Sequence, residues 1–190
     1  LAPWIEKYTY LDGKRFSFSG HEFQRDILAD EAKTSIVVKC AQVGLSEALY
    51  RYAVAACATQ DDFTCIYTFP TSTDAEKNNK TRIDPMIESS AELKRLVNPN
   101  LNNSEIKQFG RNSFLFFKGT MSGTQALSTP ANAIINDEYD ASDITTASVY
   151  VSRLQHKPHK IRKIFSTPTT DGYGISKEAE TARRMRHFAK

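Results

Sequence analysis

Apolar residues in this chain occur in short runs, separated by longer stretches of mixed character. The runs are rich in β-branched and aromatic residues, which predicts buried strands. These strands are expected at 35–40, 64–69, 133–136 and 160–166, and the first of them is expected to be buried on both faces. The stretches between them predict helices at 19–32, 46–59 and 142–155. Strands that alternate with helices favour an α/β fold, with a mainly parallel sheet and helices on both faces.

Other segments do not follow this alternation. They are an N-terminal arm at 1–12 anchored by Trp4, a polar helix at 73–90 interrupted at Pro85, a β-hairpin formed by 105–109 and 112–118, and a loop at 121–129 rich in Gly, Ser and Thr. A chain of 190 residues is long enough for one domain with one sizeable core. We therefore expect a single domain over 1–190.

The segment 39–46, between the first strand and the Ala-rich helix, has most of a P-loop pattern. That pattern is G-x-x-x-x-G-K-[ST], and Gly44 and Ser46 stand in register with it. Leu45 stands where the lysine belongs, and Lys39 stands where the first glycine belongs. Backbone N–H groups and the positive end of the helix dipole would face phosphates here. The alternative is an ordinary strand-to-helix turn with Ser46 as N-cap.

The apolar run at 133–138 ends in two carboxylates, as a Walker B strand does. Asp137 would hold Mg²⁺, and Glu138 would orient and deprotonate the attacking water. The alternative is a strand followed by an acidic turn, since Asp140 and Asp143 come next. The pattern gains weight because it lies downstream of a P-loop candidate, as the order in ATPases requires.

The strand at 160–166 ends in Ser166-Thr167-Pro168. Small hydroxyl residues at this end of a strand fall in the crevice where open α/β sheets bind ligands. The alternative is a strand closed by a proline turn.

With these three elements in order, the chain resembles the ATPase domain of a bacteriophage terminase large subunit, the DNA-packaging motor, most closely of the lambda type. In that family the P-loop lysine is often displaced to the first position, as Lys39 and Leu45 are here. Three further segments match motifs of the family. Phe23-Gln24 resembles the glutamine motif that reads adenine, and 67–71 followed by 82–87 resembles the segment after the second strand. Residues 166–168 resemble the coupling motif, which links hydrolysis to movement of DNA.

The resemblance implies a P-loop NTPase fold of the ASCE, RecA-like type that hydrolyses ATP with Mg²⁺ to move double-stranded DNA into a capsid. Ser46 and Asp137 would hold the metal. The catalytic residues would be Glu138, Lys39 and Arg82, the last as an arginine finger for a neighbouring subunit unless it pairs with Asp84 or Glu88. The nucleotide would contact Gln24, Lys39, Ala41, Gln42, Val43, Gly44, Leu45, Ser46 and Thr167.

The same resemblance implies partners and a location. They are double-stranded DNA, the terminase small subunit, the portal protein, further copies of the chain in a ring, and the host cytoplasm; no membrane span is expected. Residues 175–190 would begin a linker to a nuclease domain. Two alternatives stay open: a helicase-like ATPase, because residues 137–140 also resemble a DExD box, and a non-catalytic nucleotide- or DNA-binding module.

Charge and cysteine content add little. The net charge of +3 is uneven, with 12 basic and 14 acidic residues in 1–95 against 13 and 8 in 96–190. No acid lies between Asp143 and Asp171, where Arg153, Lys157, Lys160, Arg162 and Lys163 stand with His156 and His159. This stretch predicts either a DNA-contacting face or a solvated surface. Cys40, Cys57 and Cys65 have no metal or disulfide spacing, so we expect reduced, buried thiols.

Overall fold

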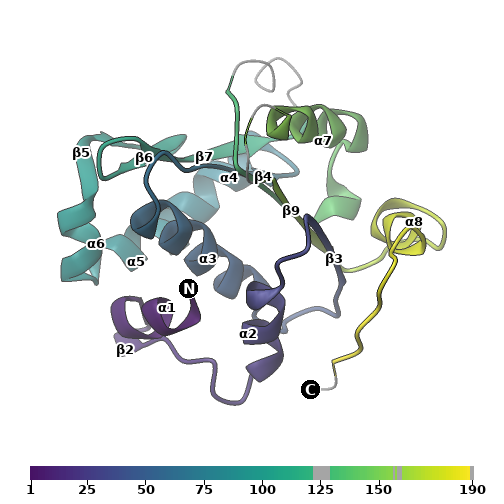
Figure 1. Cartoon of the computed structure of the whole chain (residues 1–190), viewed down its shortest axis with the longest axis horizontal. Helices are drawn as coiled ribbons and strands as arrows, with labels where there is room; N and C mark the ends of the chain where they lie inside the picture. The colour runs from purple at the N-terminus through teal and green to yellow at the C-terminus, as the bar shows by residue number, and fades with distance from the viewer. Residues whose placement is uncertain (122–128, 156, 158–159, 189–190) are drawn as a thin grey trace.

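The structure is a computed structural model that describes residues 1–121, 129–155, 157 and 160–188. Within these residues a seven-stranded sheet runs in the order β3-β9-β8-β4-β7-β6-β5 (Figure 1). The strands are β3 (Thr34–Val38), β4 (Thr64–Phe69), β5 (Val97–Asn102), β6 (Ile106–Phe109), β7 (Ser113–Gly119), β8 (Ala133–Asp137) and β9 (Ile161–Ser166).

The predicted mainly parallel sheet is confirmed. Strands β3, β9, β8, β4 and β7 all pair in parallel, so that Val38 lies beside Ser166 and Thr68 beside Asn136. The carboxyl ends of β3, β8 and β9 therefore meet at one edge. Strand β6 returns antiparallel to β7 through the predicted hairpin, and β5 pairs antiparallel with β6.

Helices cover both faces of the sheet. The α-helices are α1 (Ala2–Tyr8), α2 (Glu22–Ala29), α3 (Leu45–Thr59), α4 (Ser72–Asn78), α5 (Asp84–Glu88), α6 (Ala91–Leu96), α7 (Ile144–Val151) and α8 (Gly174–Glu180). A π-turn η1 (Asn79–Ile83), the 3₁₀ turns η3 (Tyr139–Ala141) and η4 (Ser152–Leu154), and a small hairpin of β1 (Tyr10–Leu11) and β2 (Lys14–Arg15) complete the described elements. Helices α1, α2, α3, α5 and α6 lie on one side of the sheet and α7 on the other (Figure 1).

Helix α3 is the centre of the core. Its small side chains, among them Ala48, Ala53 and Ala55, have no solvent exposure, which lets the helix approach the sheet closely while α1 and α2 cover its outer side. Arg51 is also buried, and its guanidinium pairs with Glu47 at 2.6 Å and lies over the ring of Phe16. The charge is thus compensated within the core.

Two features of the N-terminal half differ from the prediction. Residues Ala2–Tyr8 of the arm at 1–12 form the helix α1, in which Ile5 is fully buried and Trp4 is partly buried against the core. The strand at 35–40 is not buried on both faces: β3 lies at the edge of the sheet beside β9 only, and Val38 is 50 % exposed. A β-branched run is thus compatible with an edge strand as well.

The polar segment at 73–90 is more continuous than predicted. Helix α4, the π-turn η1 and α5 follow one another without a break, and Pro85 stands in the first turn of α5. A proline in a first turn removes no hydrogen bond that the helix needs, so it does not interrupt the path. The irregular turn lies just before it, at Asn79–Ile83. Such a turn inserts one residue into the helical path.

The C-terminal half also differs in detail from the prediction. The helix expected at 142–155 is shorter, because α7 ends at Val151 and continues as the turn η4. Helix α6 and strand β5 were not predicted, and α8 occupies part of the segment 175–190. The loop at 121–129 falls mostly outside the described residues. In the part of the chain that is described, no helix is both long enough and apolar enough to span a bilayer.

Candidate functional site

A pocket of about 500 Å³ opens at the carboxyl edge of the sheet, between the loop after β3, the end of β8 and the helical path α4-η1. It brings together most of the predicted site residues, which are 39, 42–46, 82, 137 and 138 in the sequence. Gln24, Ala41 and Thr167 are not among the residues that line it. This volume falls in the range of small-molecule sites.

The loop after β3 reaches the pocket through two left-handed residues. Gln42 has φ +59° and Gly44 has φ +71°, and helix α3 begins directly after Gly44. Leu45 is 2 % exposed and packs into the core, so the residue at the usual lysine position has a structural role here. The loop thus has the strand–turn–helix setting in which backbone N–H groups surround phosphates.

Lys39 reaches the centre of the site from the front of the loop. Its Nζ lies 2.9 Å from Glu138 Oε1, and its side chain is only 9 % exposed. The backbone N–H of Lys39 donates to the carbonyl of Ser166 at the end of β9. The cation is therefore held between the ends of three neighbouring strands, at the position where phosphate charge would need to be met.

Gln24 supports the loop from behind. Its side chain is buried, and Nε2 donates to the Val43 carbonyl at 2.7 Å. A Cβ on Gly44 would come within 2.9 Å of that same nitrogen, so only glycine fits this contact without a shift. Gln24 holds the loop in this structure, and its predicted contact with adenine stays a prediction.

Asp137 lies at the bottom of the pocket among three hydroxyl groups. Ser46 Oγ lies 3.4 Å from Oδ1, while Tyr67 and Tyr50 donate to Oδ2 at 3.2 and 3.4 Å. Burial, and after it the neighbouring charge of Glu138, raises the pKa of Asp137 to about 7. The hydroxyls and Lys39 oppose this shift only in part.

Sequence reasoning missed both tyrosines. Tyr50 follows Ser46 by four residues, and this spacing places both on one face of α3. This four-residue spacing from Ser46 is a signal from which the sequence could have placed Tyr50 at the site. Tyr67 is fully buried within β4 and reaches Asp137 only because β4 and β8 are neighbours. No sequence pattern identifies this pairing.

Glu138 follows directly after β8 in a left-handed conformation, with φ +49° and ψ +54°. Its side chain is 46 % exposed, so the carboxylate faces the open part of the pocket while Asp137 lies below it. Left-handed backbone is uncommon for a residue with a side chain and carries a free-energy cost. The surrounding structure must therefore stabilise this conformation.

Arg82 lies on the wall of this chain's own pocket. Its guanidinium is 3.3 Å from Glu47 Oε1, and Glu47 in turn pairs with Arg51. The alternative pairing with Asp84 is not found, because Asp84 pairs with Lys107 at 2.6 Å. The π-turn η1 carries Arg82 to this position, and such turns are frequent at functional sites.

The site has donors suitable for Mg²⁺. In the described residues no group of three or more His, Cys, Asp or Glu side chains forms a complete metal cage. One carboxylate, on Asp137, and one hydroxyl, on Ser46, are instead close together at the pocket floor. Mg²⁺ in phosphoryl-transfer sites takes few protein ligands and keeps water and phosphate oxygens, so this donor set fits it.

Part of the basic stretch predicted as a DNA-contacting face or a solvated surface is turned inward. Arg162 pairs with Glu178 at 3.1 Å, and Lys163 is buried with Nζ directed at the carbonyls of Ile27 and Asp30. Two of the five cations thus have internal roles, the second at the end of α2. His156 and His159 lie outside the described residues.

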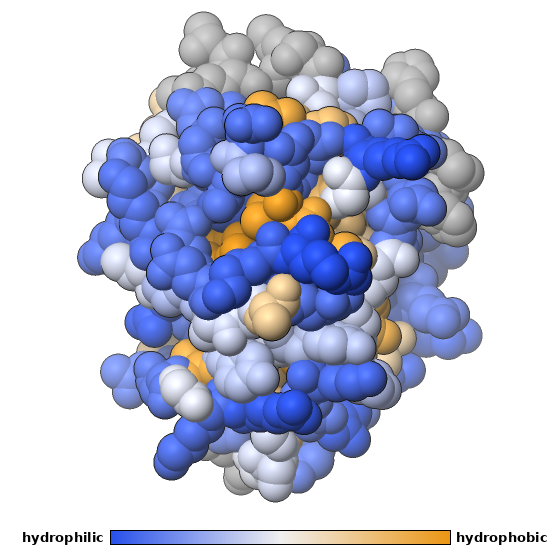
Figure 2. All heavy atoms as spheres, turned by 90° about the vertical axis from the view of Figure 1, so that its left-hand side faces the viewer, coloured by the Kyte–Doolittle hydropathy of each residue, from blue (hydrophilic) through white to orange (hydrophobic). Residues whose placement is uncertain are grey.

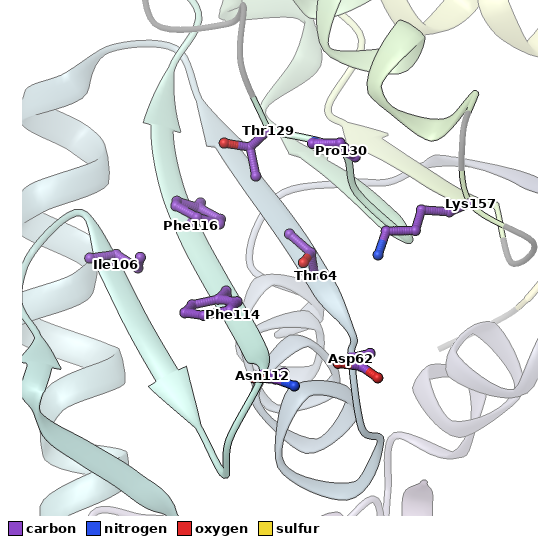
Figure 3. Close-up of a pocket in the computed structure, with 9 residues that line it drawn as sticks. All are labelled: Asp62, Thr64, Ile106, Asn112, Phe114, Phe116, Thr129, Pro130 and Lys157. Carbon is purple, nitrogen blue, oxygen red and sulfur yellow. The ribbon is translucent and has the colours of Figure 1, made fainter.

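A second pocket, of about 430 Å³, lies on the sheet face beside β7 and includes Lys157 (Figure 3). Phe114 and Phe116 project into it from alternate positions of β7. None of the predicted site residues lines it. Figure 2 shows the side of the molecule on which β5 and α6 lie. This side is mostly hydrophilic, with a small hydrophobic area near its centre.

The three cysteines are free thiols, as predicted, but the expectation that all are buried is wrong for Cys40. Cys40 is exposed in the loop, and Cys57 and Cys65 are buried, which raises the pKa of both thiols. A buried neutral thiol is a poor nucleophile, so these two have packing roles.

Comparison with known proteins identifies the fold. A family model described as the phage terminase large subunit gpA, ATPase domain, matches residues 21–189. No curated protein sequence matches the chain. Solved structures of phage large terminases share the fold of this chain.

Three of these structures illustrate the likeness. The large terminase ATPase domain of Thermus phage P74-26 has a TM-score of 0.63 at 17 % identity, over 78 % of this chain and 65 % of that one. The HK97 bacteriophage large terminase has a TM-score of 0.71 at 12 % identity, over 92 % and 38 %. The large terminase of thermophilic bacteriophage D6E in complex with ADP has a TM-score of 0.52 at 11 % identity, over 76 % of this chain and 37 % of that one. This chain therefore spans less than two thirds of each.

Proposed function

Because the chain belongs to the family of phage terminase large subunit gpA ATPase domains, we propose that it binds ATP with Mg²⁺ in the pocket at the carboxyl edge of the sheet and hydrolyses it to move double-stranded DNA into a capsid. The observation that carries the proposal is the 2.9 Å contact between Lys39 Nζ and Glu138 Oε1, beside Asp137. A cation for phosphate and a carboxylate for water then share one pocket.

The loop from Gln42 to Ser46 would bind the phosphates. Its backbone N–H groups and the start of α3 provide a positive end for phosphate oxygens. Lys39 would take the place of the missing P-loop lysine, since Leu45 is buried in the core. Ala41 and Thr167 are proposed to contact the nucleotide more peripherally.

Ser46 and Asp137 would hold Mg²⁺, which when bound neutralises the charge on the phosphates. Tyr50 and Tyr67 both donate to Oδ2 of Asp137, and this orients the carboxylate so that Oδ1 stays on the Ser46 side. Orientation of a metal ligand by neighbouring hydrogen bonds typically changes metal affinity by about 10- to 100-fold.

Glu138 would act as the general base for the attacking water. Its half-exposed carboxylate faces the open part of the pocket, where a water can approach it. A carboxylate accepts a proton from water, and the Lys39 ammonium lies 2.9 Å from its Oε1. The proton from the water would go to a Glu138 carboxylate oxygen.

Arg82 would supply a further positive charge to the transferred phosphoryl group. Its place on the wall of this chain's own pocket supports action within the chain, although an arginine finger can also act on a neighbour's nucleotide. Glu47 holds the guanidinium at this wall through a 3.3 Å contact.

The partners belong to the same proposal. They are double-stranded DNA, the terminase small subunit, the portal protein and further copies of this chain in a ring, acting in the host cytoplasm. Family membership supports these partners, and the ADP complex of the D6E large terminase supports a nucleotide as ligand of the fold.

Steady-state ATP turnover tests the proposal. We expect hydrolysis by the parent chain that depends on Mg²⁺, and a loss of at least a hundredfold in Glu138→Gln, which retains the shape of the side chain but is a far weaker base. Glu138→Gln should still bind ATP with Mg²⁺. Nucleotide binding without turnover in the parent would instead favour a non-catalytic module.

A further inference from the structure

The strained backbone of Glu138 is held by the two residues that follow it. Tyr139 has no solvent exposure, and Asp140 is 9 % exposed, so the turn η3 is packed into the molecule immediately after the base. A left-handed residue persists only where its surroundings determine it. The contacts of this turn therefore decide where the carboxylate of Glu138 points.

Asp140 makes most of these contacts through its carboxylate. Oδ2 accepts hydrogen bonds from the N–H of Thr169 at 2.8 Å and from the Thr169 hydroxyl at 3.0 Å. Oδ1 accepts one from the N–H of Ile175 at 2.7 Å, and the backbone N–H of Asp140 donates to Ser166 Oγ at 3.1 Å. The turn is thus fastened to the end of β9 and to the start of α8.

The chain at α8 approaches this carboxylate so closely that a side chain would not fit. Gly174 has φ +53°, and a Cβ on it would lie 2.4 Å from Asp140 Oδ1. Further along α8, Glu178 accepts a hydrogen bond from the Tyr139 hydroxyl at 2.9 Å. Both residues after the base therefore contact α8, at two different points of the helix.

We propose that Asp140 is the positioning residue of the catalytic base: by fastening the turn after Glu138 to residues 169–175, it keeps the Glu138 carboxylate directed at the attacking water. The proposal rests on the proposed ATPase function. Asp140 is not one of the residues lining the ATP pocket, and it acts through the backbone of Glu138. Misplacement of a catalytic group by about 1 Å can cost on the order of a hundredfold in rate, so such a contact can control turnover.

A purely structural contact predicts something different. It would lower the stability of the fold when broken and would leave the rate of the folded molecules unchanged. A positioning contact lowers kcat while leaving KM and nucleotide binding close to the parent values, because the phosphate-binding loop is on a different strand.

Two glycines two residues apart provide a matched pair of variants. Gly174→Ala places a methyl group against Asp140 Oδ1, whereas Gly172→Ala has φ +68° and meets nothing within 4 Å. Both substitutions impose left-handed backbone on alanine, and Gly174→Ala should lower stability further because its methyl group meets Asp140, so kcat is compared per folded molecule. We expect Gly174→Ala to lower kcat at least tenfold with KM within threefold of the parent, and Gly172→Ala to stay within twofold in kcat.

A double-mutant cycle shows whether the effect passes through the carboxylate. Asp140→Ala should itself lower kcat, and Gly174→Ala should cause less than a twofold further loss in that background, because the group it displaces is gone. If Gly174→Ala does not fold, Thr169→Val replaces it, since it removes one donor to Asp140 from an exposed residue. Thr170→Val is its control, and we expect a threefold or larger difference in kcat between the two.

The outcomes separate this inference from the function on which it rests. Equal kcat in the Gly174→Ala and Gly172→Ala variants, in a parent that hydrolyses ATP, overturns the inference alone. So does a full additional loss in the Asp140→Ala background. A parent that does not hydrolyse ATP overturns the proposed function and this inference with it.

Discussion

At the scale of single residues, the site depends on two charges that are held in opposite ways. Asp137 is buried among hydroxyls, so its charged form is disfavoured and its pKa rises to about 7. Lys39 is nearly buried as well, but its ammonium lies 2.9 Å from the Glu138 carboxylate. The pocket therefore contains a cation, Lys39, that an anionic ligand would stabilise, and a carboxyl group, Asp137, whose charged form a metal ion would stabilise. This combination suits an anionic ligand that carries a metal.

The lysine displaced to the front of the loop can be tested directly. We expect Lys39→Ala to lower ATP turnover at least tenfold, about 1.4 kcal/mol of transition-state stabilisation, because no other side chain of the loop carries a positive charge. Leu45→Ala is the matched control at the usual lysine position. It should cost stability, because Leu45 is buried, but far less turnover per folded molecule. Equal small losses of turnover in both variants would show that Lys39 has no such role.

The raised pKa of Asp137 predicts how stability depends on pH. Between its ordinary pKa of 3.8 and about 7, the folded chain binds more protons at this group than the unfolded chain does. The free energy of unfolding should therefore fall as pH rises through this range, by up to about 4 kcal/mol for a shift of this size. Above pH 7 this contribution no longer changes.

Urea denaturation at pH 5 and pH 8, with a chelator present, measures this dependence. Asp137→Asn cannot titrate, so its free energy of unfolding should change less between the two pH values than that of the parent. Parallel changes in the two proteins would contradict the assignment.

At the scale of elements, the segment that carries Arg82 is held by a buried ion pair. Lys107 on β6 has no solvent exposure, and its Nζ lies 2.6 Å from Asp84 Oδ1 at the start of α5. The same Nζ also donates to Asn102 Oδ1. The hairpin of β5 and β6 is thereby joined to the helical path that brings Arg82 to the pocket.

Removal of this lysine should therefore destabilise the fold. We expect Lys107→Met, which retains the apolar length of the side chain, to lower the free energy of unfolding by about 2 kcal/mol, since it leaves Asp84 and Asn102 without their partner. Lys118→Met on neighbouring β7 breaks a pair with an exposed carboxylate, Glu105, and should change it by about 0.5 kcal/mol or less. Urea denaturation compares the two, and equal effects would mean that burial does not matter here.

At the scale of the whole molecule, the pocket lies across the carboxyl ends of β3, β8 and β4, with the loop after β3, the pair Asp137-Glu138 and Arg82 around it. All three groups come from one chain. This arrangement supports the proposed binding of nucleotide without a second subunit, whereas the proposed ring would add contacts from outside. Whether Arg82 acts on the nucleotide of its own chain or on that of a neighbour distinguishes these two arrangements.

Mixed assemblies of the packaging motor test that role. When Arg82→Ala and Glu138→Gln subunits are combined, each site lacks one function if Arg82 acts within its own chain. Hydrolysis by the mixture should then stay between the low rates that the two variants show when each is measured alone. Recovery of turnover well above that level would show that Arg82 reaches a neighbour's nucleotide instead.

The sequence by itself determined the elements and the chemistry that are local in the chain. The run before Lys39, the turn at Gly44 and the helix after it depend on neighbours within a few residues, as does the pair Asp137-Glu138 at the end of a strand. The hairpin of β6 and β7 was predicted for the same reason. Local backbone preference and apolar patterning suffice for such features.

The tertiary structure decided everything that depends on which strands become neighbours. Strand β9 lies between β3 and β8, and this order brings Ser166 to Lys39 and Asp140 to Thr169. The same order leaves β3 at the edge, against the prediction of a strand buried on both faces, and turns Lys163 of the basic stretch inward. Contacts between residues far apart in sequence follow from packing of the whole core, to which no short segment of the chain has access.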